Sequence, residues 1–154
     1  MNNRAWFALA VLFAINLLNF FDRQLAAVLG EPIRLEFGLN DTVLGLLGTA
    51  FILFYALAGI PMGRLTDRWL RTRLIGIGVA IWSVFTAATG FAWNTTSFFV
   101  TRIGVGVGEA VCAPACQSLI GDLYEPRHRA RALGIFMLGL PVGLSLAFFF
   151  GGLI

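Results

Sequence analysis

Five long apolar segments constrain this 154-residue chain more than any other feature of its sequence. A membrane-spanning helix needs about 20 mostly apolar residues, because the hydrocarbon core is about 30 Å thick and each helical residue rises about 1.5 Å. The segments that meet this requirement lie at about residues 5–29, 42–62, 74–93, 97–122 and 132–154. Asn40, Asp41 or Thr42 can cap the second helix. The sequence therefore predicts an all-α integral membrane protein, a polytopic helical bundle with about five transmembrane helices.

The composition leads to the same fold class. Hydrophobic residues make up 58% of the chain and charged residues only 12%, whereas soluble domains carry about 25% charged residues. Mean hydropathy is +0.84. A soluble protein of this size could not bury so much apolar surface in one core. Membrane lipid is therefore the first predicted partner.

The distribution of arginine predicts the orientation. All 11 basic residues are arginines, and eight of them precede the first span or lie in the connections after the second and fourth spans. Cytoplasmic loops of membrane proteins collect basic residues, so we predict a cytoplasmic N-terminus and cytoplasmic arginine-rich loops. We expect no nucleic-acid partner, because the basic residues do not form a stripe on a soluble fold.

Four charged residues lie inside the predicted spans: Asp22, Arg23, Arg102 and Glu109. Each costs about 2.5–3.5 kcal/mol at a helix centre, so such residues usually mark a substrate or proton pathway. Asp22 and Arg23 are adjacent and point about 100° apart, so each is expected to find partners on other helices. Arg102 and Glu109 lie on one face of the fourth span and can line one cavity. The alternative is a buried ion-pair network that only holds the helices together.

The chemistry of these side chains predicts how protons would be coupled. A buried carboxyl group can be neutral or charged, and a nearby arginine favours the charged form. Arginine stays protonated at accessible pH, so Arg23 and Arg102 serve as fixed counter-charges. We expect Asp22 and Glu109 to exchange protons, with Arg102 as the partner of Glu109. Asp122, at the end of the fourth span, is expected to pair with the arginines of residues 127–131.

A glycine-rich run follows Arg102, with Gly104, Gly106 and Gly108 at alternate positions. No strand precedes the run, so a nucleotide-binding loop is not indicated. Small residues at this spacing instead let another helix approach closely. Cys112 and Cys116 flank Pro114 in the same segment, and packing is their expected role. Neither has the partners of a metal site, no nucleophile–base set appears, and we predict no cofactor and no enzyme activity.

The connection after the second span carries the most specific motif. Gly63, Asp67, Arg68 and Arg71 resemble the cytoplasmic signature of the major facilitator superfamily between its second and third helices. Leu70 stands where that signature usually has a second glycine. The resemblance implies that Gly63 lets helices pass closely. It also implies that Asp67 joins a charge network with the other half of the transporter, which helps hold the outward-facing state.

Further stretches resemble the same family over the whole chain. Arg102 and the glycines after it are similar to its fourth-helix motif, whose arginine faces the cavity. Segments 19–24, 59–64 and 108–110 look like the spinster-type branch, whose members are associated with export of sphingoid and lysolipid molecules. The fifth-helix antiporter signature is matched only loosely, by glycines around Pro141, and does not decide antiport.

The resemblance implies a fold of twelve helices in two halves, each built from inverted three-helix repeats. This chain would supply the N-terminal part, and the C-terminal half would be its partner. The implied function is secondary active, proton-coupled transport of a small or amphiphilic, lipid-like solute across the bacterial inner (plasma) membrane. The second hypothesis is a small polytopic membrane protein with a structural, assembly or regulatory role and no transport of its own.

Overall fold

The computed structural model describes residues 3–153 as a bundle of helices. Five of its helical segments are long and apolar enough to cross a membrane, which confirms the predicted fold class. The fifth is divided into two helices by a turn at Leu138. In chain order the helices are α1 (Asn3–Val28), α2 (Gly30–Glu36), α3 (Asp41–Arg68), α4 (Arg71–Thr89), α5 (Thr95–Leu123), α6 (Pro126–Met137) and α7 (Gly139–Gly151).

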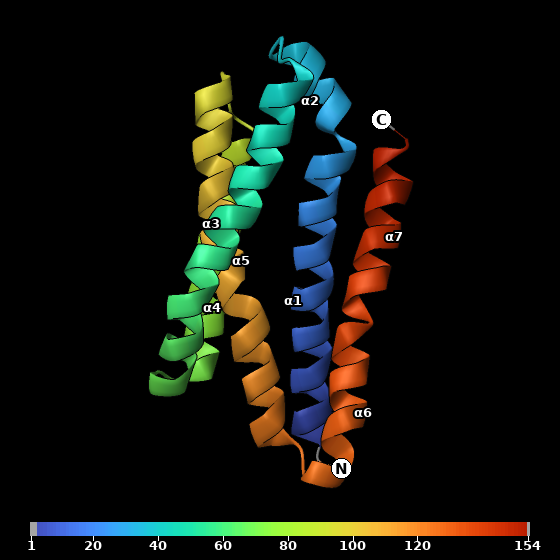
Figure 1. The fold of residues 1–154 in the computed structure, drawn as a ribbon. Coiled ribbons are helices and arrows are strands. Elements are labelled where there is room, and N and C mark those ends of the chain that lie inside the picture. The colour runs from blue at the N-terminus through green and yellow to red at the C-terminus, as the bar shows by residue number, and fades with distance from the viewer. Residues whose placement is uncertain (1–2, 154) are drawn as a thin grey trace.

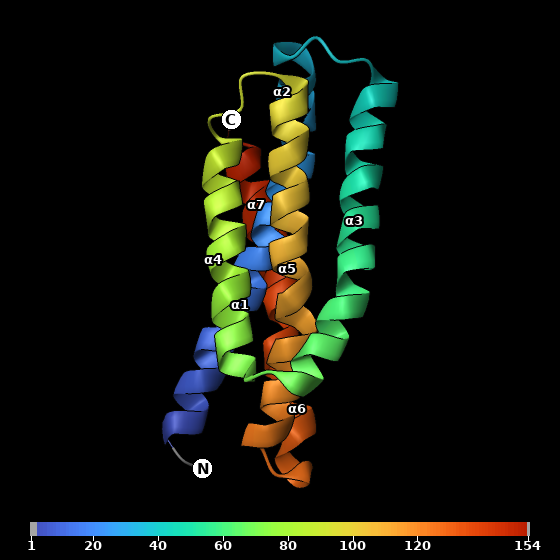
Figure 2. The same cartoon turned by 90° about the vertical axis from the view of Figure 1, so that its left-hand side faces the viewer.

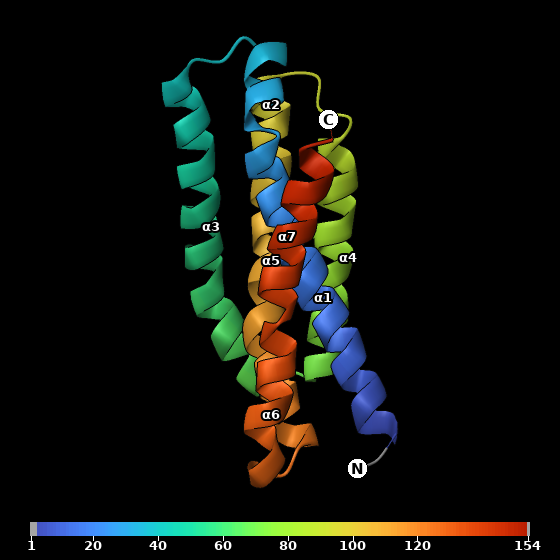
Figure 3. The same cartoon turned by 90° about the vertical axis from the view of Figure 1, so that its right-hand side faces the viewer.

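The long helices run roughly alongside one another, with the two chain ends at opposite ends of the bundle (Figure 1). Helix α1 packs along α7, and α5 packs against both α3 and α4. Helix α3 stands apart from α1 and α5 at its N-terminal end and approaches α5 at its C-terminal end, as Figures 2 and 3 both show. This divergence leaves a cavity that is lined by residues of α1, α2, α3 and α5 at one end of the bundle.

Two asparagines begin the helices that frame this space. The side chain of Asn40 accepts a hydrogen bond from the backbone N–H of Val43 at 2.8 Å, so Asn40 is the cap of α3. Asn94 caps α5 by accepting from the N–H of Ser97 at 2.7 Å, and the Ser97 hydroxyl accepts from the N–H of Asn94 at 3.2 Å. This reciprocal arrangement satisfies two backbone donors that the helix leaves unpaired.

The helices also extend into the predicted connections. Helix α3 continues to Arg68, so most of the arginine-rich motif is helical and only two residues separate α3 from α4. The polar stretch after α1 contains the short helix α2, which is followed by Gly38 with a φ of +61°. A side chain at Gly38 would be strained, because L-residues rarely adopt a positive φ.

The core is built around α5, whose apolar stretch is 56% buried, compared with 6% for that of α3. The alternate glycines of α5 explain its close contacts. A Cβ at Gly104 would lie 2.4 Å from the ring of Phe85, and a Cβ at Gly108 would lie 2.6 Å from the backbone nitrogen of Trp82. Both neighbours belong to α4, so the predicted close approach at these glycines is confirmed.

Glycines also bring α7 against α1. A Cβ at Gly143 would lie 2.5 Å from the backbone oxygen of Leu17, and one at Gly139 would lie 2.9 Å from Nδ2 of Asn16. That Asn16 nitrogen donates to the backbone oxygen of Phe136 at 2.8 Å, next to the turn between α6 and α7. Of the loosely matched glycines of the fifth span, Gly139 and Gly143 therefore form a close contact with α1.

Candidate functional site

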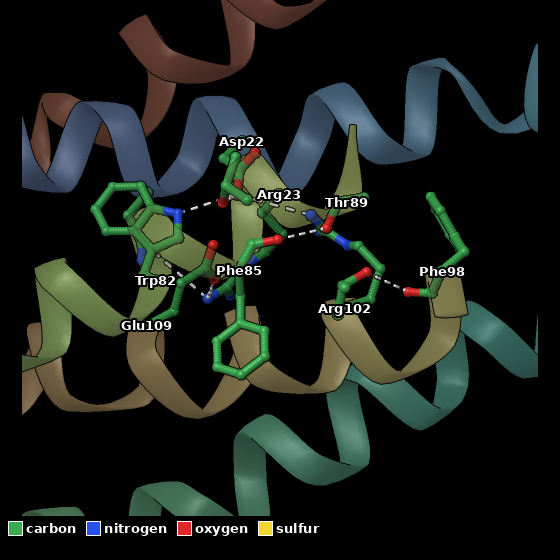
Figure 4. A network of polar contacts seen from close by, with 11 residues as sticks. Asp22, Arg23, Trp82, Phe85, Thr89, Phe98, Arg102 and Glu109 are labelled. Atoms are coloured by element: carbon green, nitrogen blue, oxygen red, sulfur yellow. Dashed lines mark hydrogen bonds and ion pairs between the residues drawn. The ribbon is translucent and has the colours of Figure 1, made fainter. Parts of the chain in front are cut away.

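The four charged residues predicted inside the spans meet at the middle of the bundle. Asp22 and Arg23 come from α1, and Arg102 and Glu109 come from the facing helix α5, with α4 beside them (Figure 4). Glu109 is 0% exposed and Arg102 is 8% exposed. The structure thus brings together all four residues, which lie up to 87 positions apart in the sequence.

Glu109 pairs with Arg23. The Nη2 atom of Arg23 lies 2.8 Å from Oε2 of Glu109, and its Nε atom lies 3.2 Å from the same oxygen. The predicted partner of Glu109 was Arg102, and that assignment is wrong. Arg102 lies two helical turns from Glu109 on the same helix, whereas Arg23 reaches across from α1.

Asp22 lies among donors from two helices. Its Oδ2 atom accepts hydrogen bonds from Nε1 of Trp82 at 3.0 Å and from the hydroxyl of Thr86 at 2.9 Å. The same oxygen lies 3.7 Å from Nη1 of Arg102, which makes an ion pair but not a short hydrogen bond. The expectation that adjacent Asp22 and Arg23 find their partners on other helices is therefore confirmed.

The resulting arrangement is crossed. The acid of α1 faces the arginine of α5, and the arginine of α1 faces the acid of α5. Each helix therefore contributes one charge of each sign, and the site is balanced when both acids are ionised. Loss of charge on either acid would leave one arginine without its counter-charge, which is costly in a buried environment.

Aromatic rings surround the Arg23 guanidinium. It lies 4.2 Å from the ring centroid of Tyr55, 5.5 Å from that of Phe20 and 5.6 Å from that of Phe51. Phe51 also lies 5.1 Å from the guanidinium of Arg102, so one ring of α3 contacts both arginines. Gly106 makes room for this ring, because a Cβ there would lie 3.2 Å from it. Through Phe51, helix α3 therefore contacts the arginine of each ion pair.

Sequence reasoning missed the residues that hold Asp22 from α4. Trp82 and Thr86 are four positions apart and so occupy one face of that helix. A tryptophan and a threonine at this spacing inside an apolar span were the available signal. Their partner could not be read from the sequence, because the pattern does not fix how α4 is rotated toward α1.

A cavity of about 400 Å³ lies where α3 diverges from α1 and α5. Three polar side chains line it, from Arg23, Gln24 and Arg102, and the remaining lining residues are apolar or glycine. The cavity is therefore lined by the two arginines of the ion pairs and by an apolar wall formed mainly by α1, α2 and α3. This arrangement can accept a molecule that has an anionic group and an apolar part.

The motif residues at the end of α3 have different surroundings. Asp67 and Arg68 are exposed, and nothing within the described residues 3–153 lies within 4 Å of a Cβ built on Gly63. No helix within residues 3–153 approaches Gly63 closely, so the close approach expected from the motif stays a prediction. The glycine faces open space in the structure, in contrast to those of α5.

Arg71 joins α4 to the end of α5. Its Nε atom donates to the hydroxyl of Ser118 at 2.7 Å, and its Nη1 atom forms an ion pair with Asp122. The prediction that Asp122 pairs with the arginines of residues 127–131 is thus wrong. Arg129 instead donates to the backbone oxygen of Gly121 at 2.6 Å, and Arg127 pairs with Glu125.

Comparison with known proteins identifies relatives of the chain. The family profile of the Major Facilitator Superfamily matches residues 12–154. The chain is 35% identical over 140 residues to a probable L-galactonate transporter of Escherichia coli strain K12, covering 91% of this chain and 31% of that protein. It is 37% identical over 150 residues to human protein spinster homolog 1, covering 96% and 28% respectively. The chain spans about a third of the length of the curated relatives it matches.

A solved structure has the same fold. It is the crystal structure of a bacterial homolog to the human lysosomal transporter Spinster, in an inward-facing and unoccupied conformation. The two structures superpose with a TM-score of 0.94 at 41% sequence identity, covering 99% of this chain and 32% of the other. The resemblance to the superfamily and to its spinster-type branch is therefore confirmed.

Proposed function

Because this chain belongs to the Major Facilitator Superfamily, we propose that it forms the N-terminal part of a secondary active, proton-coupled transporter of a small or amphiphilic solute. Transporters of this type move a solute by alternately exposing a central site built from two repeated halves. The missing C-terminal half of the transporter would supply the other wall. The single observation that carries the proposal is the crossed set of ion pairs on α1 and α5.

Glu109 is the proposed proton carrier. Its carboxylate has one oxygen on Arg23 and is fully buried. Protonation of this group removes the negative charge that holds the Arg23 guanidinium. Arg23 is then free to move or to bind an anionic solute group, because the aromatic rings around it stabilise a cation without neutralising it. Deprotonation of Glu109 restores its ion pair with Arg23 and releases the anionic solute group.

Asp22 has the supporting role in this proposal. It lies near Arg102 but also accepts two hydrogen bonds from α4. These donors stabilise the carboxylate when Arg102 turns toward a solute. The two acids then differ in function, because Asp22 keeps donors when its arginine leaves, whereas Glu109 depends on Arg23 for its one ion pair.

The cavity supports an amphiphilic solute with an anionic group. Arg23 and Arg102 would bind the anionic group, and the apolar wall of α1, α2 and α3 would contact the rest. The E. coli relative is named for L-galactonate, a carboxylate, and the resemblance to the spinster branch favours a lipid-like molecule. Both suggestions share a negatively charged or polar end that two arginines can bind.

The motif at the α3–α4 connection is proposed as a gate. Asp67 and Arg68 are exposed at the end of α3, where they are available to another part of the transporter. Gly63 faces open space, so a helix of the missing half could approach it closely. Arg71 would anchor the gate through its pair with Asp122 on α5, the helix that carries Glu109.

The arginine-rich loops are proposed to be cytoplasmic, in the inner membrane of a bacterium. Single cysteines at positions 68 and 94, introduced after replacement of Cys112 and Cys116, test this orientation with a membrane-impermeant thiol reagent added outside. We expect labelling at position 94 only. Labelling at position 68 only would reverse the topology and would place the gate on the opposite side.

The coupling proposal is tested with the native-length protein in liposomes that carry an imposed pH gradient. The probes are radiolabelled L-galactonate and a lysophospholipid, and the variants are Glu109→Gln and Asp22→Asn. Each variant keeps the shape of the side chain but cannot exchange the proton. We expect gradient-driven flux of the transported probe to be lost in Glu109→Gln and weakened in Asp22→Asn, while solute exchange without a gradient survives.

Two results separate coupling from packing. If the ion pairs only hold the helices together, Glu109→Gln should aggregate or express poorly, and any folded protein should keep its response to the pH gradient. A well-folded double variant with unchanged gradient-driven flux would contradict the coupling role of both acids.

A further inference from the structure

Two buried polar atoms next to the Arg23–Glu109 pair have no hydrogen-bond partner within residues 3–153. They are Nδ2 of Asn19 and Oε1 of Glu109. Asn19 is 6% exposed and Glu109 is 0% exposed, so neither side chain is open to bulk solvent. Buried polar atoms are normally hydrogen-bonded, so two unpaired ones beside the same ion pair point to a binding position for a small polar molecule.

Both groups meet at the same guanidinium nitrogen. Nη2 of Arg23 lies 2.8 Å from Oε2 of Glu109 and 3.5 Å from Oδ1 of Asn19. The amide of Asn19 and the carboxylate of Glu109 each accept a hydrogen bond from Arg23 through one oxygen. The second polar atom of each group makes no hydrogen bond within residues 3–153. The unused atom of Asn19 is a donor, and that of Glu109 is an acceptor. A ligand that fits both must accept one hydrogen bond and donate another.

We propose that one water molecule binds between Asn19 and Glu109 and is the proton donor and acceptor for Glu109. The water oxygen accepts from Nδ2 of Asn19, and one water O–H donates to Oε1 of Glu109. Buried waters typically make about three such hydrogen bonds to polar groups that are otherwise unsatisfied. This inference rests on the proton-carrying role proposed above for Glu109.

The proton step balances with hydronium as the co-reactant. A hydronium ion at this position transfers one proton to Oε1, which forms the O–H bond of a neutral carboxylic acid and leaves a neutral water. The other carboxyl oxygen, Oε2, then no longer carries the charge that pairs with Arg23. Release is the reverse step, with the proton passing from Oε1 to the bound water.

The other titratable and charged groups near Glu109 do not offer this function. The two arginines remain protonated, and Oδ2 of Asp22 is occupied by donors from α4 and α5. The thiol of Cys112 points to the backbone oxygen of Gly108, at 3.9 Å. Within residues 3–153 these groups are Asp22 and Arg23 of α1, Tyr55 of α3, and Arg102 and Cys112 of α5.

Asn19 is therefore a positioning residue, and Asn16 provides a matched control. Both are asparagines of α1 that are 6% exposed, but Nδ2 of Asn16 already donates to the backbone oxygen of Phe136. Asn19→Leu removes the group that would hold the water. Asn19→Ser retains a hydroxyl that can hold it, and Asn16→Leu removes a buried amide that the proposal does not use.

The test is infrared difference spectroscopy of the native-length protein as the pH is lowered, in ordinary water and in water labelled with heavy oxygen. Wild type and Asn16→Leu should show a carboxylic acid carbonyl band that is lost in Glu109→Gln, together with an O–H stretching band that shifts in labelled water. Asn19→Leu should lose the O–H band and shift the carbonyl band, and Asn19→Ser should retain both. Persistence of the O–H band in Asn19→Leu, or its equal loss in Asn16→Leu, would overturn the proposal.

A second measurement keeps this inference separate from the proposed function. If Glu109→Gln leaves the carbonyl band unchanged, the coupling role of Glu109 fails. A high-resolution structure of the native-length protein then tests the water site alone. We expect density for one water between the two atoms in wild type and Asn16→Leu but not in Asn19→Leu. A solute hydroxyl at that position, or a direct Asn19–Glu109 hydrogen bond, would exclude the water.

Discussion

The interior around α5 and the connection between α3 and α4 contain the same kinds of residue, glycines and paired charges, in opposite surroundings. In the interior, Gly108 lies against the backbone of α4 and Glu109 is fully buried against Arg23. At the connection, Gly63 faces open space, and the side chains of Arg71 and Asp122 are 33% and 52% exposed. The same residue types are therefore tightly constrained in one region and exposed in the other, where they are open to another partner.

The largest loss of stability is expected when one member of the buried ion pair between Arg23 and Glu109 is replaced. Replacing Arg23 by Leu should destabilise the protein by about 3 kcal/mol, the lower end of the range for breaking a buried pair, because the Arg23 side chain stays 28% exposed. Glu109→Leu added to that variant should recover part of the loss. Unfolding of the native-length protein in detergent provides the measurement, completed as a double-mutant cycle. A larger coupling energy between Arg102 and Glu109 would show that the crossed pairing is wrong.

The second-largest difference in stability between the two regions is expected when their glycines are replaced. Gly108→Ala places a Cβ 2.6 Å from the backbone nitrogen of Trp82, which cannot move without shifting α4. We expect a loss of about 1–3 kcal/mol, typical of overpacking. Gly63→Ala meets no atom within 4 Å in residues 3–153 and should therefore cost less than Gly108→Ala, with any loss arising from a helix outside these residues. Thermal unfolding of both variants measures this. Equal losses in the two variants would contradict the contrast between the two regions.

The smallest effect is expected at the exposed pair. Asp122→Asn should change stability by about 0–1 kcal/mol, and added salt should reduce even that, because surface pairs are weak and screened. Unfolding at low and high salt measures both quantities. If Asp122→Asn proves as costly as Arg23→Leu and insensitive to salt, the contrast between the two regions fails.

The sequence predicted which charges would gather but not how they would pair. A charge deep in an apolar span must find a partner, so Asp22, Arg23, Arg102 and Glu109 could be assigned to one site from their depth alone. The pairing depends on how α1 is rotated toward α5, and periodicity in a span that is apolar on every side does not determine that rotation. Arg23 was therefore missed as the partner of Glu109.

The glycines show the same limit of prediction, because the sequence does not always show which helix lies beside them. Close packing at Gly104 and Gly108 was predictable, because alternate glycines in a membrane helix have few other roles. For Gly63 the motif is family-specific, and no atom within residues 3–153 lies close enough to test the helix approach that it implies. Trp82 and Thr86 could not be assigned either, because a polar residue in an apolar helix indicates that it has a partner but not which one.

Proton uptake by the native-length protein tests the central claim most directly. The solubilised protein is shifted to lower pH in a weakly buffered solution that contains an indicator dye, and wild type, Glu109→Gln and Asp122→Asn are compared. The crossed-pair account predicts that wild type and Asp122→Asn take up a proton that folded Glu109→Gln does not. Equal uptake by wild type and a folded Glu109→Gln variant would contradict it, because Glu109 would then carry no proton and the pairs would serve only to hold α1 against α5.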